Sequence, residues 1–166
     1  MIFLDDLQLD MVKSDDDKRE LEEIKSKDIL KFLSEKNLYW DRMPEVVNFI
    51  ARSSAGETVG GASLYNIRWF NRTAYISIFV DVDKQGRGFG KKILKKTLKY
   101  AFEVMNLQRV TAEVYEYNEP SLKLFESVGF TKEGIIRKAK YMDGKYWNIL
   151  IYGLLRDEYF NGQTRE

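Results

Sequence analysis

The chain has 166 residues, of which 44% are hydrophobic and 32% charged, and a formal net charge of +1. That length suits one domain with a sizeable core, so we expect a single domain over residues 1–166. It contains no cysteine and no histidine. Disulfides, thiolate nucleophiles, histidine-based catalytic triads and the usual zinc sites are therefore excluded. Proton transfer is left to Asp, Glu, Lys, Tyr, the substrate or water.

No export or membrane signal is evident. Residues 1–10 carry three aspartates and no basic residue, unlike a secretory signal. The longest apolar stretch, residues 149–155, is far shorter than the ~20 residues that cross a bilayer. We therefore expect a cytoplasmic protein without a membrane partner.

Charge is distributed unevenly. Residues 1–24 hold nine acidic and three basic residues, whereas the stretch from Lys84 to Lys99 holds seven basic residues and no acidic one. Solvated helix faces would account for both segments. The alternative is an anionic ligand near the middle of the chain and a cationic one near its start.

The first half of the chain combines helical and strand patterns. Residues 3–11 are a candidate strand, and Ser14 is a candidate N-cap for a helical pattern that reaches Leu33. Turn signals then separate three short predicted strands. These strands cover residues 46–51, 58–65 and 73–82.

The second half begins with the clearest helix of the chain, over residues 91–106. A strand over residues 110–117 and a short helix over residues 121–128 follow. Asp143-Gly144 is a strong hairpin signal between strands at residues 134–141 and 145–155. This order predicts a mixed sheet with helices on its faces.

A glycine-rich loop joins the strand at residues 73–82 to the long helix. Its sequence is Gln85-Gly86-Arg87-Gly88-Phe89-Gly90-Lys91. Free N–H groups at a helix start, next to residues without Cβ, can bind phosphate oxygens. Basic residues in the first helical turn oppose the helix dipole, and a bound anion would reverse that penalty. The spacing fits neither the Rossmann nor the Walker pattern. A plain surface loop and an RNA-binding segment are the alternatives.

This loop resembles the acetyl-CoA pyrophosphate loop of the GNAT acetyltransferase superfamily, Q/R-x-x-G-x-G/A. A second segment follows the family's spacing V-x-x-x-N-x-x-S/A-x-x-L-Y-x-x-x-G-F. Its matching residues here are Val114, Asn118, Ser121, Leu124, Phe125, Gly129 and Phe130. The C-terminal sequence resembles that of one branch of the superfamily, whose members acetylate ribosomal-protein N-termini and polyamines.

The resemblance implies a GNAT-like α+β fold. Its central sheet would be mixed but mostly antiparallel, with about seven strands and helices on both faces. The fourth and fifth strands would splay apart to admit the pantetheine arm.

The resemblance also implies direct transfer of the acetyl group of acetyl-CoA to a primary amine, without a metal. The acceptor would be a polyamine, an aminosugar or aminoglycoside, or a peptide N-terminus. A backbone N–H near Val80 would polarise the thioester carbonyl. Asn118 has a second use as a helix N-cap. The implied cofactor-binding residues are Ile78, Phe79, Val80, Gln85, Gly86, Arg87, Gly88, Phe89, Gly90, Lys91, Asn118, Ser121 and Phe125.

The catalytic residues are less clearly defined. Glu113 lies 12 positions before Phe125. This resembles the separation of the general base and the general acid in some N-terminal acetyltransferases of the superfamily, but a glutamate here would also suit an exposed strand face. Phe125 stands where the family has a tyrosine acid, and it has no proton to give. The substitutes are Tyr115, Tyr117 and Tyr141; a thiolate can also depart unaided, because a thiol pKa is about 8.5.

Further expectations concern partners. The acidic residues 1–24 would line a groove for a cationic amine, and Asp143, Glu133 and Asn148 are additional polar candidates. We expect no nucleic-acid partner and allow for a homodimer. Two other functions stay open: a CoA-binding protein with little catalysis, and a nucleic-acid-binding module that uses the stretch from Lys84 to Lys99.

Overall fold

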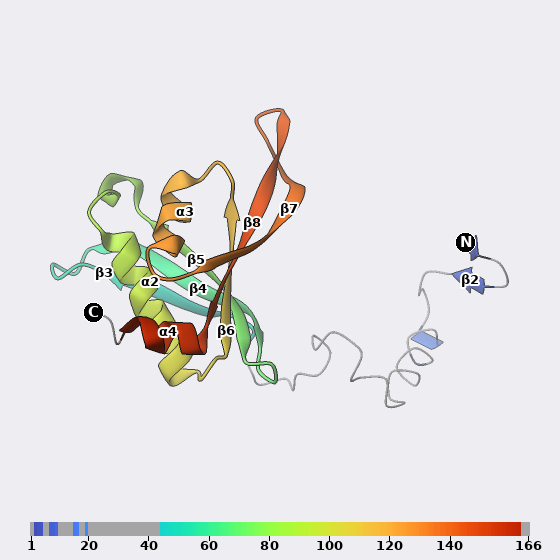
Figure 1. Cartoon of the computed structure of the whole chain (residues 1–166), viewed down its shortest axis with the longest axis horizontal. Helices are drawn as coiled ribbons and strands as arrows, with labels where there is room; N and C mark the ends of the chain where they lie inside the picture. Colours follow the sequence, from blue (N-terminus) through green and yellow to red (C-terminus); the bar gives the residue numbers. More distant parts are fainter. Residues whose placement is uncertain (1, 5–6, 10–14, 17–18, 20–43, 164–166) are drawn as a thin grey trace. The chain divides into compact units, whose positions relative to one another are not determined.

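The computed structural model describes residues 2–4, 7–9, 15–16, 19 and 44–163 (Figure 1). The chain divides into two compact units, residues 1–41 and 42–166. The single domain expected over the whole chain stays a prediction. Among the described residues, every helix is too short or too polar to span a membrane.

In the first unit, β1 (Ile2–Leu4) and β2 (Leu7–Leu9) pair antiparallel. The single strand predicted over residues 3–11 is therefore wrong. Strands disfavour aspartate, and Asp5-Asp6 stands between the two short strands in the sequence. Ser14, the helical pattern up to Leu33 and most of the acidic segment lie outside the described residues.

The second unit is built on a six-stranded sheet in the order β3-β4-β5-β6-β8-β7. Within it, β5 and β6 run parallel and all other neighbouring pairs are antiparallel. The predicted fold class, a mixed but mostly antiparallel sheet with helices, is confirmed, with six strands in this sheet rather than about seven. The strands are β3 (Val47–Arg52), β4 (Thr58–Arg68), β5 (Thr73–Val80), β6 (Arg109–Tyr115), β7 (Thr131–Met142) and β8 (Lys145–Leu155).

Helices follow β5, β6 and β8 along the chain. The described α-helices are α2 (Phe89–Lys99), α3 (Glu119–Glu126) and α4 (Arg156–Gln163). A 3₁₀ turn, η3 (Val82–Lys84), precedes the glycine loop, and a π-helical turn, η4 (Tyr100–Val104), extends α2. The helix predicted over residues 91–106 thus begins two residues earlier. The sequence did not predict α4, because its apolar residues do not recur at helical spacing.

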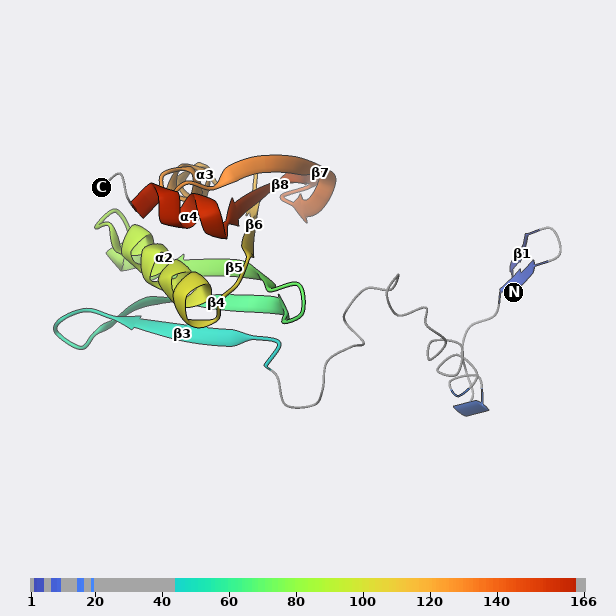
Figure 2. The same cartoon turned by 60° about the horizontal axis from the view of Figure 1, so that its bottom comes forward.

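The core lies between one face of the sheet and these helices. The side chains of β6 alternate, so that Ala112 and Val114 point into the core whereas Glu113 and Tyr115 are exposed on the other face. The rings of Phe102 in η4 and Tyr159 in α4 stack against the same core, with a centroid distance of 4.8 Å. Helix α2 lies against β4 and β5 (Figure 2). Helices on the second face stay a prediction, since the early helical pattern lies outside the described residues.

The splay between the fourth and fifth predicted strands is present between β5 and β6. These strands pair over three residues only, with Thr73 opposite Arg109 and Tyr75 opposite Thr111. Beyond this point β5 continues to Val80 and β6 to Tyr115 without pairing to each other. The sheet therefore opens toward the ends of these two strands.

The β7–β8 hairpin turns at Asp143-Gly144, as the sequence predicts. Both residues have positive φ angles, 53° and 78°, which a two-residue type I′ turn requires. The end of this hairpin projects beyond the rest of the second unit (Figure 1). It carries the exposed side chains of Tyr141 and Tyr146.

Candidate functional site

The glycine loop adopts a shape that leaves the start of α2 open. Gly86 and Gly88 have φ angles of 74° and 78°, in the left-handed region that favours glycine. Gly88 is the N-cap of α2, and its position supplies no side-chain hydrogen bond to the first helical turn. The Gln85 side chain donates from Nε2 to the Val80 carbonyl at 3.2 Å, which joins the loop to the end of β5. The first N–H groups of α2 therefore have no side-chain cap, and the loop before them is tied to β5.

A cleft of about 610 Å³ opens at this loop, between the end of β5 and the starts of α2 and α3. Eleven of the thirteen residues expected to bind the cofactor line it, and the exceptions are Arg87 and Phe125. Arg87 donates to the Asp83 carbonyl at 3.4 Å instead. Lys84, Pro120 and Leu124 also line the cleft, although the sequence did not single them out for it.

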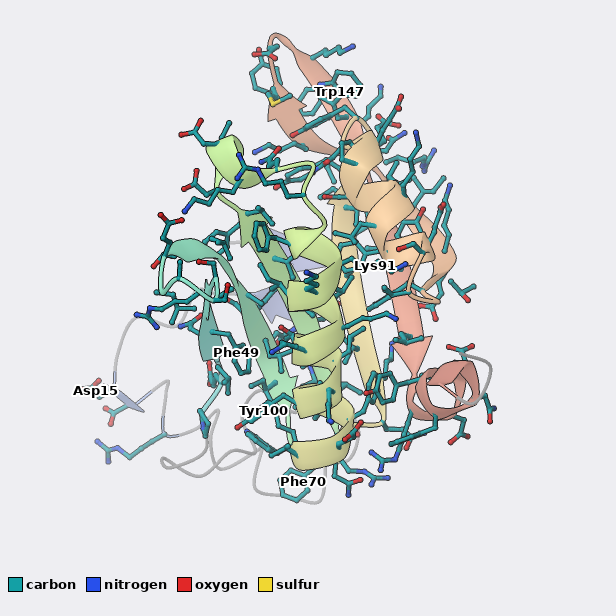
Figure 3. All side chains as sticks on the ribbon, turned by 90° about the vertical axis from the view of Figure 1, so that its left-hand side faces the viewer. Asp15, Phe49, Phe70, Lys91, Tyr100 and Trp147 are labelled. Atoms are coloured by element: carbon teal, nitrogen blue, oxygen red, sulfur yellow. The ribbon has the colours of Figure 1, made fainter. Side chains whose placement is uncertain are left out.

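The cleft is narrow where α2 begins. A Cβ atom added to Gly90 would lie 3.3 Å from Leu124 Cδ2 and 3.7 Å from Val80 Cγ2. The next residue, Lys91, lies on the side of α2 toward α3 (Figure 3). A cation therefore borders the cleft immediately after the glycine that keeps it open.

A second cavity of about 230 Å³ lies next to the first, at the splay between β5 and β6. Both cavities are lined by Ile78, Asn118 and Ser121, so they meet at these residues. Asn118 caps α3 as well: its Oδ1 accepts a hydrogen bond from the Ser121 N–H at 3.2 Å. The structure thus combines the N-cap use of Asn118 with a position at the junction of the cavities.

Polar and aromatic side chains surround the second cavity. Glu113 and Tyr115 come from β6, Tyr65 comes from β4 and Ser77 from β5. Phe125 borders this cavity rather than the first one, with only 4% of its side chain exposed. Two of the catalytic candidates named from the sequence, Glu113 and Tyr115, therefore lie together.

Tyr117 does not line either cavity. Its ring stacks on Tyr115 at a centroid distance of 5.4 Å and meets Trp147 edge-on at 5.0 Å. Trp147 comes from β8, near the end of the hairpin (Figure 3). Tyr117 thus packs between Tyr115 and Trp147, outside the two cavities. Tyr141 packs against Tyr146 near the tip of the hairpin.

The remaining polar candidates from the sequence are held in other contacts. Arg109 Nη1 donates to Glu133 Oε1 at 2.8 Å, and the other oxygen of this carboxylate pairs with Arg109 Nη2. The hydrogen bond from Arg109 lowers the pKa of Glu133. Asn148 is bonded to Glu116, and neither Asp143, Glu133 nor Asn148 lines the two cavities.

Tyr65 is a residue of the second cavity that sequence reasoning missed. Burial raises the pKa of its phenol, and Glu113, Tyr75 and Tyr115 raise it further. The only sequence signal was its position at the end of the predicted strand 58–65. Its proximity to Glu113 depends on the pairing of β4 with β5 and on the splay beyond it, which a single sequence does not give.

A sequence profile of the acetyltransferase (GNAT) family matches residues 11–130. The chain is 32% identical over 111 residues to the SPbeta prophage-derived uncharacterized N-acetyltransferase YokL of Bacillus subtilis (strain 168). The aligned residues cover 67% of this chain and 63% of that protein. The chain is 26% identical over 113 residues to a spermidine N(1)-acetyltransferase of Vibrio cholerae, covering 68% of this chain and 65% of that one. The match spans less than two thirds of these relatives' length.

The fold has solved counterparts. The crystal structure of spermidine N-acetyltransferase from Vibrio cholerae in complex with CoA and spermine superposes with a TM-score of 0.69. The superposition covers 90% of this chain and 80% of that one, at 23% identity. This likeness establishes the fold, and the sequence profile establishes the family. The chain belongs to the acetyltransferase (GNAT) family.

Proposed function

We propose that this chain is an N-acetyltransferase that transfers the acetyl group of acetyl-CoA to a primary amine. The observation that carries the proposal is the meeting of two cavities at Ile78, Asn118 and Ser121. One cavity has the features of a diphosphate site, and the other presents the carboxylate of Glu113. Bound acetyl-CoA would supply an activated thioester at the junction.

The cleft residues fit the chemistry of CoA. The uncapped N–H groups of α2 and the cations Lys84 and Lys91 suit a diphosphate. Along β5, Ile78, Phe79 and Val80 pair with β4 on one side and lack a β6 partner on the other. That free strand edge suits the amide groups of a pantetheine arm, which would add to it as an extra strand.

Glu113 would accept the proton that the amine loses. An exposed alkylamine has a pKa of about 10.4, so at neutral pH a base is needed to release the free amine. As the C–N bond forms, the C–S bond breaks, and the thiolate departs or takes a proton from water. Phe125 cannot supply that proton. A backbone N–H near Val80 would stabilise the charge on the carbonyl oxygen.

Binding of CoA tests the cofactor half of the proposal by calorimetry. We expect Lys91→Gln to weaken binding by about 3- to 10-fold, the worth of one partly exposed charge. Lys96→Gln is the matched control, because Lys96 lies on the same helix but lines a separate cavity beside β3. Equal effects of the two variants, or no binding of CoA to the parent protein, would contradict the proposal.

Mass-detected acetylation of an amine panel tests the transfer itself. The panel contains spermidine, kanamycin and a short peptide with a free N-terminus. We expect Glu113→Gln to lower kcat/KM at pH 7 by about 100-fold or more, as loss of a general base does. Glu119→Gln is the control, since Glu119 is an exposed carboxylate outside both cavities.

A CoA-binding protein with little catalysis is the second candidate, because Phe125 is buried and carries no hydroxyl. Binding of CoA without acetylation of any panel amine would favour it. A nucleic-acid module is weaker: Lys84 pairs with Glu57 at 3.1 Å, and Lys91 and Lys96 line different cavities. A homodimer, a cytoplasmic location and the absence of a metal stay predictions.

A further inference from the structure

Tyr65 lines the second cavity, and it lies outside the family motifs found in the sequence. The cavity brings its side chain together with Glu113 and Tyr115, which come from a strand on the far side of β5. Tyr65 is half-buried, whereas Glu113 is exposed at the cavity. A group bound beside Glu113 would therefore have Tyr65 as its neighbour.

A β-bulge follows Tyr65 in β4. Tyr65 pairs with Tyr75, but Arg68 pairs with Thr73, so β4 contains one more residue than β5 over this interval. Asn66, the next residue, has a φ angle of 49°. Bulges of this kind re-aim side chains and are frequent beside functional sites. The ring of Tyr65 also contacts that of Tyr75 at 5.6 Å, which restrains its rotation.

The phenol group of Tyr65 is available to a ligand. Within the described part of the chain, its oxygen makes no hydrogen bond. Burial and the nearby Glu113 carboxylate raise the pKa of the phenol, so the phenol is neutral at neutral pH. A neutral phenol offers one donor and accepting lone pairs, and its ring face attracts cations.

We propose that Tyr65 is an acceptor-binding residue, whose oxygen accepts a hydrogen bond from the amine that Glu113 deprotonates. Together the two side chains hold a primary amine between a carboxylate and a phenol. The recognised ligand class is an alkylamine in its charged or neutral form. This inference rests on the proposed function, because it assigns the amine to the second cavity.

The test compares Tyr65→Phe with Tyr75→Phe. Both remove one hydroxyl from neighbouring rings, but Tyr75 does not line the cavity. With the best amine of the panel, we expect Tyr65→Phe to raise the KM for the amine about 10- to 100-fold, the worth of one hydrogen bond to a charged group. The value of kcat should change less than threefold, and the calorimetric Kd for CoA should not change. Tyr75→Phe should leave all three unchanged.

The outcomes separate this inference from the proposed function. If the parent protein acetylates an amine but Tyr65→Phe leaves the amine KM unchanged, the inference is overturned and the proposed function stands. A fall in kcat with constant KM also overturns it. If no amine is acetylated, both are overturned. Thermal unfolding of the two variants, expected to match the parent protein, verifies that each is folded.

Discussion

Asn148 donates two hydrogen bonds to the carboxylate of Glu116, from its backbone N–H to Oε1 at 2.7 Å and from Nδ2 to Oε2 at 2.9 Å. Its own Oδ1 accepts from the N–H of Lys138 at 2.9 Å, at an irregularity in β7. Glu116 follows Tyr115, which borders the second cavity. The pair therefore ties the end of β6, and with it the cavity, to the β7–β8 hairpin.

Substitution of Asn148→Asp would place a second carboxylate against Glu116. We expect the free energy of unfolding to fall by about 1–3 kcal/mol at pH 8, because a donor is lost and like charges meet. The two carboxylates then share a proton more readily in the folded state, so the loss should shrink toward pH 5. Urea unfolding at both pH values measures this. Adding Glu116→Gln should restore stability at pH 8; an equal loss at both pH values would contradict the expectation.

The left-handed conformation of Gly88 can be tested against a matched turn. Gly88→Ala and Gly56→Ala both put a Cβ at a positive φ, 78° and 82°, with no atom within 4 Å. Each should cost about 1–2 kcal/mol of folding stability. Only Gly88→Ala should weaken CoA binding, by about tenfold. The strained backbone would no longer hold the N–H groups at the start of α2 in the geometry that binds the diphosphate. Equal CoA affinities for the two variants, measured by calorimetry, would refute this role of the loop.

Phe125→Tyr should restore a proton donor for the departing thiolate. Phe125 lines the second cavity, so an added hydroxyl would lie near the proposed reaction site. We expect kcat at pH 7 to rise about tenfold, toward the lower end of what a positioned acid contributes. Phe130→Tyr is the control, since Phe130 is the edge-on ring partner of Phe125 at 5.0 Å and does not line the cavity. An unchanged kcat in Phe125→Tyr would contradict this expectation and would show that the missing proton donor does not limit the rate.

The Arg109–Glu133 pair makes stability depend on pH. The hydrogen bond from Arg109 lowers the pKa of Glu133 in the folded protein. The pair therefore stabilises the fold above the ordinary carboxyl pKa of about 4.3, and this contribution is lost as the pH falls through the folded value. We expect Glu133→Gln to cost about 1 kcal/mol at pH 7, a value reduced for partial exposure, and less at pH 3. A pH-independent difference in urea unfolding would contradict this.

Local chemistry explains what the sequence could predict. Asp143-Gly144 indicates its turn because few residues adopt two successive positive φ angles. Leu94 and Leu98 repeat at the helical period, so α2 could be located. The pairing of β1 with β2 was missed because a segment of this length with several apolar residues reads as one strand when strand propensity is the only signal.

The sequence by itself determined the β-α-β order, the open glycine loop and the absence of cysteine and histidine chemistry, and through its motifs the family. Only the tertiary structure brought Tyr65 beside Glu113, separated Tyr117 from the cavity, and assigned Glu133 and Asn148 to pairs of their own. The reason is physical. Turns, caps and periodicity depend on residues a few positions apart, whereas a site formed by three strands depends on register, bulges and splay, which the packing of the whole sheet decides.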